Sequence, residues 1–171
     1  MIEHELILLG LLKEGSKHGY QIKKDIKEIL PLFAGVDLKS IYYPLRVLEK
    51  GGLVVKRLVK PGRHPVRYVY ELTPKGQDRF DTLLTKSFLD FKRPQFSLDL
   101  SLYFLNYIKP KIAKRRLRGR MLILKRLSKD MRQTIDVLKK KGAASLARIL
   151  EHNLRMVETE FHFLYSFIKT I

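Results

Sequence analysis

The sequence predicts a mainly helical fold of the α+β class, made of a helical N-terminal region with one β-hairpin and a C-terminal region of long helices. Apolar residues recur at helical spacing over most of the 171 residues. Two runs rich in β-branched and aromatic residues flank one loop in the first half of the chain. The last third repeats its apolar residues in steps of three and four, which is typical of long packed helices.

Two amphipathic helices are predicted first. Leucines recur at helical intervals from Leu6 to Leu12, and Gly15 ends the series. A second apolar series begins at Ile22, with lysines on the opposite side. Pro31 lies within its pattern, so we expect this helix to end or bend just before the proline.

The stretch "SIYYPLRVLEKGGLV", residues 40–54, is predicted to be a short helix that stops at paired glycines. Pro44 has no N–H group, a defect that is tolerated only near a helix start. We therefore expect the helix to begin close to Ser40, with Asp37 or Ser40 as its cap. Its buried stripe is predicted to be Ile41, Leu45 and Leu48.

A β-hairpin and a further helix are predicted next. "LVVKRLV" and "VRYVYEL" have the composition of strands, and the "KPGRHP" between them has that of a loop. Thr73 is the expected N-cap of the following helix, and Pro74 its first residue. Its inward residues are predicted to be Phe80, Leu83, Leu84, Phe88 and Phe91. Three helices, a hairpin and a helix make residues 1–94 a winged helix-turn-helix domain.

Residues 95–171 are predicted to form a helical dimerisation domain. "FSLDLSLYFLNYI" is apolar around most of its circumference, which indicates burial from several sides. Pro110 starts a long helix with a heptad seam, and a second seam closes the chain. A second copy of the chain could cover these seams, or the two helices could pair internally around "KKKGAAS". The candidate dimerisation residues are Leu117, Met121, Leu124, Met131, Leu150, Leu154, Val157, Phe161, Leu164 and Ile168.

The charge predicts a polyanionic partner. Lys and Arg number 35 against 17 Asp and Glu, a formal net charge of +18 with a pI of about 10.1. Residues 95–171 hold 17 of these cations and 6 of the acids. The cluster from Lys114 to Arg120 is either the solvated outer face of a helix or an auxiliary phosphate-binding ridge.

Double-stranded DNA is the predicted partner if the helix that starts near Ser40 enters a groove. Its outward side would then offer side chains that bind phosphates or base edges. For Tyr42, a packing role and a DNA-contact role both stay open. These candidates are Lys39, Ser40, Tyr42, Tyr43 and Arg46. The loop of the hairpin would add Lys60, Arg63, His64 and Arg67.

Other classes of protein are less consistent with the sequence. Without cysteine there is no disulfide and no thiolate metal site, and no serine lies in a Gly-x-Ser-x-Gly setting. Glu158 and His162 stand four apart, and an exposed helix pair is a better interpretation than a metal site. We therefore predict no enzyme activity, no metal and no cofactor. The N-terminus lacks a signal-peptide pattern and no apolar run approaches a membrane span, so a cytoplasmic protein without a membrane partner is expected.

Three motifs together resemble the PadR-type transcriptional regulators. They are "LILLGLLKEGSKHGYQI", "SIYYPLRVLEKGGLV" and "RYVYELTPKG". The resemblance implies a homodimeric repressor with a C-terminal dimerisation region and, in many members, control by a small hydrophobic effector. It also implies that Tyr20 and Tyr42 are tyrosines of the family pattern, which we include among the DNA-binding candidates, and that Ser40, Arg46 and the cations of the hairpin loop occupy its DNA-facing positions.

The sequence thus predicts a sequence-specific DNA-binding regulator, a homodimeric repressor of a palindromic operator. Two alternatives remain open at this point. One is a basic winged-helix protein that acts through RNA or protein contacts, and the other is a peripheral membrane-binding protein.

Overall fold

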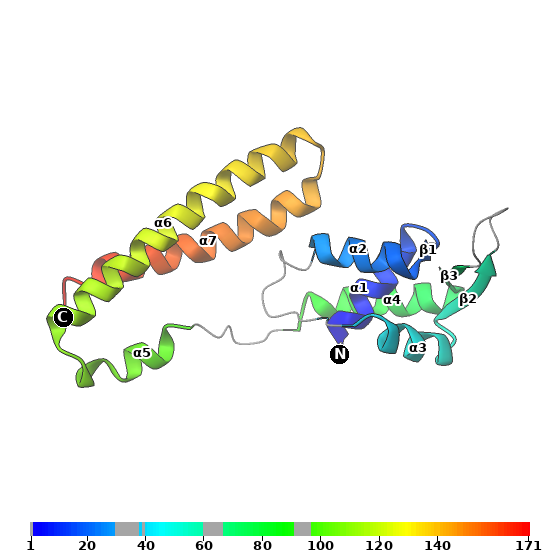
Figure 1. Ribbon diagram of the computed structural model, residues 1–171, viewed down its shortest axis with the longest axis horizontal. Helices are drawn as coiled ribbons and strands as arrows, with labels where there is room; N and C mark the ends of the chain where they lie inside the picture. The colour runs from blue at the N-terminus through cyan, green and yellow to red at the C-terminus, as the bar shows by residue number, and fades with distance from the viewer. Residues whose placement is uncertain (1, 30–37, 39, 60–66, 91–96) are drawn as a thin grey trace. The chain divides into compact units, whose positions relative to one another are not determined.

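The computed structural model describes residues 2–29, 38, 40–59, 67–90 and 97–171, and it divides the chain into two compact units (Figure 1). Unit 1 is Met1–Lys92 and unit 2 is Arg93–Ile171. Each unit has its own apolar core.

Unit 1 contains helices α1 (Ile2–Lys13), α2 (Gly19–Ile29), α3 (Tyr42–Lys50) and α4 (Pro74–Ser87). Its strands are β1 (Lys17–His18), β2 (Val54–Val59) and β3 (Arg67–Leu72), in the antiparallel order β1-β3-β2. The register of the hairpin runs from Val54 opposite Leu72 to Val59 opposite Arg67. This arrangement confirms the predicted winged helix-turn-helix. The short strand β1 is additional, since two residues are too few to give a periodic pattern.

The core of unit 1 joins α1, α2, α3 and the sheet. Leu8, Leu9, Ile22 and Leu45 are fully buried in it. Burying one such side chain stabilises a fold by about 1.5–3 kcal/mol. The predicted stripe of α3 is confirmed, because Ile41, Leu45 and Leu48 all lie in this core.

The cap predicted for α3 is wrong. The N-cap residue is Ile41, which makes no side-chain cap hydrogen bond, and Ser40 lies outside the helix; Asp37 is outside the described residues. Pro44 explains the shift. A helix capped at Ser40 would require an N–H from Pro44, whereas a start at Tyr42 makes Pro44 the third helical residue, whose N–H has no intrahelical acceptor. The first helical hydrogen bond then runs from Leu45 N–H to the Ile41 carbonyl, at 3.0 Å.

A group of hydrogen bonds links the end of α3 to the start of α4. The Thr73 hydroxyl donates to the Gly52 carbonyl at 2.8 Å and accepts from Gly76 N–H at 3.0 Å. The Thr73 N–H donates to the Leu53 carbonyl at 3.1 Å, and Lys75 Nζ donates to the Gly51 carbonyl at 2.9 Å. Thr73 is therefore the N-cap and Pro74 the first helical residue, as predicted.

The predicted inner face of α4 is correct only in part. Leu83 is buried and Phe80 packs against the core. Leu84 is exposed because it lies about 100° around the helix from Leu83. Phe88, 82% exposed, follows the end of the helix at Ser87, so the helical spacing no longer applies to it. Phe91 lies outside the described residues.

Unit 2 contains α5 (Asp99–Tyr103), the 3₁₀ turn η2 (Leu105–Tyr107), α6 (Pro110–Lys140) and α7 (Ala144–Phe167). Helices α6 and α7 pack side by side as an internal antiparallel pair (Figure 1). Gly142, with φ of +71°, forms the turn between them. Of the two arrangements left open by the sequence, one chain therefore shows the internal pair.

Both predicted seams lie along this pair. Buried seam residues are Leu117, Leu124, Ser128, Ile135, Ala147, Leu150 and Leu164. The Ser128 hydroxyl is satisfied by the Leu124 carbonyl, at 2.9 Å. The prediction that segment 97–108 is buried is wrong for the single chain: Leu98 joins the core, but Tyr103 is 78% exposed and Tyr107 89%. The helix breaks after Tyr103, so only one side of it meets the core.

Gly76 gives a direct test of this packing. A Cβ atom at this position would lie 2.0 Å from the Leu53 carbonyl oxygen, which is backbone and cannot move freely. We expect Gly76→Ala to lower the free energy of unfolding by about 1–3 kcal/mol or more, measured by urea denaturation. The control is Gly119→Ala in α6, where the Cβ meets open space and should add about 0.5–1 kcal/mol. Equal effects of the two substitutions would contradict the packing described.

Candidate nucleic-acid interface

The outward side of α3 carries polar and aromatic groups. Ile41, Leu45 and Leu48 hold the helix to the core, and this fixes the opposite side toward solvent. Tyr42, Tyr43 and Arg46 are all exposed there, Tyr43 by 69%. Ser40, just before the helix, is exposed as well. A guanidinium, two phenols and a hydroxyl can donate hydrogen bonds to phosphates or base edges.

Tyrosines extend this surface beyond α3. Gly19 at the start of α2 lies between two rings, since a Cβ there would be 3.6 Å from a Tyr70 ring atom and 3.7 Å from a Tyr42 ring atom. Tyr20, the next residue, is exposed. Both distances are ordinary van der Waals contacts, so the start of α2 lies directly beside the rings of Tyr42 and Tyr70.

Tyr70 lies in the core of unit 1, behind this surface. It is buried, and burial, aided by the charges of Glu49 and the neighbouring tyrosines, raises the pKa of its phenol.

Besides the predicted loop cations, the hairpin carries a cation–aromatic pair that the sequence did not indicate. Lys56 Nζ lies 3.7 Å from the centre of the Tyr68 ring, and Tyr68 is exposed. Tyr68 and Tyr70 are two residues apart in β3 and therefore share one side of the strand, but Tyr70 is buried and Tyr68 is not. Arg57 pairs with Glu71 across the hairpin, at 3.1 Å.

The turn before α2 is ordered by His18, as expected. The His18 N–H donates to Gln21 Oε1 at 2.7 Å, and its ring Nδ1 lies 3.3 Å from the Tyr68 carbonyl oxygen. Lys17 Nζ donates to Asp25 at 2.7 Å and to Glu14 at 2.9 Å, and these two bonds raise the pKa of Lys17. The turn thus fixes α2 next to β3.

Several predicted contact residues lie outside the described residues, and one has a side chain that is not described. Lys39, Lys60, Arg63 and His64 fall outside the described residues. Arg67 begins β3 and pairs with Val59, and its side chain is not described. The structure therefore brings together Tyr20, Tyr42, Tyr43 and Arg46, with Ser40 beside them.

The candidate dimerisation residues pack within unit 2. Leu117, Leu124, Leu150 and Leu164 are buried, and the others are half-buried along the same seam; these others are Met121, Met131, Leu154, Val157, Phe161 and Ile168. The internal pair of α6 and α7 thus uses the face that the sequence assigned to a partner.

The structure also describes residues that bear on a metal site and on a membrane span. Among the described residues, no group of three His, Asp or Glu side chains is arranged to hold a metal ion, and Glu158 pairs with Arg132. In the same residues, no helix is long and apolar enough to cross a membrane.

Comparison with known proteins shows which family and which solved structures the chain resembles. Residues 8–82 match the family model described as "Transcriptional regulator PadR-like family". No curated protein sequence matches. Bacillus subtilis PadR, solved in complex with operator DNA, has 21% sequence identity and a TM-score of 0.78, with 97% of each chain covered.

Two further structures have the same fold. The PadR-like regulator BC1756 from Bacillus cereus is 19% identical with a TM-score of 0.67, covering 98% of this chain and 96% of its own. Bacillus subtilis PadR in complex with p-coumaric acid is 20% identical with a TM-score of 0.72, covering 97% and 93%. The chain thus matches the PadR-like family of transcriptional regulators over residues 8–82, in unit 1, and it shares the fold of these structures over nearly its whole length.

Proposed function

We propose that the protein is a cytoplasmic, sequence-specific DNA-binding repressor that acts as a homodimer on a palindromic operator. The observation that carries the proposal is the division of α3 into a core-facing stripe and an outward side that holds Tyr42, Tyr43 and Arg46. A rigid helix with such a side can enter the major groove. A structural relative was solved with operator DNA.

Each contact has a role in this proposal. Arg46 pairs with a guanine edge, and Tyr42 and Tyr43 donate hydrogen bonds to bases or phosphates. Tyr20, Lys39 and Ser40 bind phosphates beside α3. The cations of the hairpin, Lys60, Arg63, His64 and Arg67, follow the backbone or enter the minor groove.

Selection of duplexes from a random pool tests this function. We expect an inverted repeat whose half-sites are separated by about one helical turn, roughly 34–36 Å. With Arg46→Gln, the preference at one base pair of each half-site should fall by about 1–3 kcal/mol.

The control is Lys86→Gln on α4, which removes the same charge from an exposed position outside the proposed interface. It should leave the selected sequence unchanged, and Lys60→Gln should erode the preference less than Arg46→Gln does. Recovery of no common sequence from the pool would refute the function.

The domain roles follow from this function. We propose residues 1–94 as the DNA-binding domain and residues 95–171 as the dimerisation domain. Unit 2 leaves apolar side chains exposed to solvent, and a second copy of the chain would bury them. Arg120, Ile123 and Leu127 share one face of α6, because they are three and four residues apart. Arg120 bonds Glu160, and Glu160 lines an apolar cavity of about 300 Å³ with Met156 and Phe163.

One exposed apolar surface therefore spans α6 and α7, and we assign the dimer contact to it. Ile123→Glu should convert the dimer to a monomer, measured by sedimentation equilibrium, because a buried unpaired carboxylate opposes association. Leu122→Glu is a matched control. Leu122 is 70% exposed and Ile123 68%, but they point about 100° apart around the helix. Equal effects of the two substitutions on the dimer would contradict this assignment.

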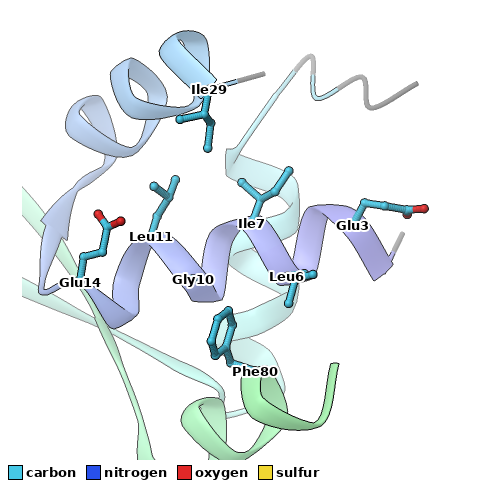
Figure 2. A pocket seen from close by; sticks show the side chains of 8 residues that line it. All are labelled: Glu3, Leu6, Ile7, Gly10, Leu11, Glu14, Ile29 and Phe80. Atoms are coloured by element: carbon cyan, nitrogen blue, oxygen red, sulfur yellow. The ribbon is translucent and has the colours of Figure 1, made fainter. Parts of the chain in front are cut away.

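We also propose control by a small hydrophobic effector. A relative was solved with p-coumaric acid. Unit 1 has an apolar cavity of about 460 Å³ along α1, with Ile7, Leu11 and Phe80 in its wall and Gly10 at its floor (Figure 2). Such a volume suits a small planar ligand. The cavity of unit 2, which also includes Leu102, is the second candidate.

Thermal melting with p-coumaric acid and related phenols as probes tests this proposal. A ligand that binds the folded state raises the melting temperature. Ile7→Trp fills the first cavity and Leu102→Trp fills the second, so one of them should cancel the shift while the other serves as its control. If none of the probes shifts the melting temperature of the unsubstituted protein, control by such an effector is refuted.

A further inference from the structure

Helix α6 carries a line of cations on its exposed side. Residues 110–129 hold nine Lys and Arg and no Asp or Glu. The line consists of Lys111, Arg115, Arg118, Arg126 and Lys129, which we call the α6 ridge. All five are exposed. Their spacing of three or four residues, with exposed Leu122 between Arg118 and Arg126, aligns them on one side of the helix over about 27 Å.

The ridge faces away from the core. The stripe that packs against α7 consists of Ala113, Leu117, Leu124 and Ser128. These residues lie on the opposite side of the helix from Arg115 and Arg126. The ridge therefore points to solvent because the internal pair holds the other side of α6.

The cations of α6 include a group that pairs with glutamates of α7 and the separate group of the ridge. Three cations beside α7 are neutralised: Arg120 pairs with Glu160, Arg132 with Glu158 and Lys139 with Glu151. These glutamates are all the acidic residues of α7. Within the part of the chain that the structure describes, no ridge cation has an acidic partner.

This distribution differs from that of an ordinary solvated helix. Surface helices commonly alternate Glu and Lys three or four residues apart, and like charges at that spacing destabilise the helix. Here Lys111 and Arg115 are four apart, and Arg115 and Arg118 are three apart, with no acid between them. A polyanion along the ridge would relieve this repulsion and release its own counterions.

We propose that the α6 ridge is a second DNA-binding surface, which binds the phosphate backbone of duplex DNA without reading its sequence. The inference rests on the proposed function for the class of partner. Arginine and lysine at regular spacing suit phosphates, which repeat along every duplex whatever its sequence. The surface adds affinity for any duplex, and α3 adds the preference for an operator.

An anionic membrane fits this surface less well. A helix that lies in a membrane interface inserts an apolar face and keeps its cations on the opposite side. The face of α6 opposite the ridge is occupied by α7, and the exposed Ile123 and Leu127 belong to the surface assigned above to the dimer contact, which leaves no apolar face free to insert. Leu122 is the single apolar residue on the ridge line.

The test compares two triple variants that keep the full chain. Arg115→Gln, Arg118→Gln and Arg126→Gln remove three ridge charges from exposed positions. We expect weaker binding to a random-sequence duplex, and a slope of log affinity against log salt that flattens by about 0.9 for each phosphate that the variant no longer neutralises. The ratio of operator to random-duplex affinity should stay unchanged.

The control triple is Lys141→Gln, Arg148→Gln and Arg155→Gln, which removes the same charge from exposed positions of unit 2 away from the ridge. Both triples should melt as the unsubstituted protein does. If the two triples give the same salt slope, the ridge proposal is overturned. Loss of operator preference in the ridge triple would overturn it as well.

Two further measurements separate this proposal from membrane binding and from a failure of the proposed function. Flotation with phosphatidylserine vesicles tests the membrane: if the ridge triple loses vesicle binding but keeps its duplex affinity and salt slope, the proposal is overturned. Because the random duplex needs no operator, the ridge result stands even if selection recovers no common sequence. Failure of the proposed function would instead appear as recovery of no common sequence from the pool by the unsubstituted protein.

Discussion

The hydrogen bonds around Thr73 hold α3, the hairpin and α4 of unit 1 in one arrangement. Thr73 caps α4, bonds the backbone at Gly52 and Leu53, and stands where the hairpin returns to the core. Gly76 lets the first turn of α4 lie directly against the Leu53 carbonyl, because any side chain there would collide with it. The end of α3, the start of β2 and the start of α4 therefore move together, and this fixes the outward side of α3 relative to the hairpin.

Periodicity predicted most of the fold, since it reports which side of an element is buried. The stripes of α1 and α3, the capped start of α4 and the seams of α6 and α7 all follow from spacing and cap chemistry. The start of α3 at Tyr42 lies close to the predicted Ser40, but the predicted cap was wrong, because only the register capped at Ile41 leaves Pro44 without a required N–H. Strand β1 was missed because it owes its existence to pairing with Tyr70 and Val69 rather than to its own two residues.

The candidate site was predictable on α3 and less so elsewhere. Tyr43 and Arg46 follow directly from the stripe opposite them. The exposure of Tyr68 and its contact with Lys56 depend on where the core ends, which alternation along one strand does not encode. Hydrophobicity around residues 97–108 predicted burial from several sides, but it could not show whether the same chain provides the cover. The single chain leaves Tyr103 and Tyr107 exposed.

The distribution of tyrosine has a spectroscopic consequence. The chain has eight tyrosines and no tryptophan. Five of them, Tyr20, Tyr42, Tyr43, Tyr68 and Tyr70, belong to the surface around α3 or to its support. Ultraviolet emission from the unlabelled protein therefore comes largely from the groups nearest to the proposed DNA. Quenching of that emission would follow DNA docking in real time without an added fluorophore.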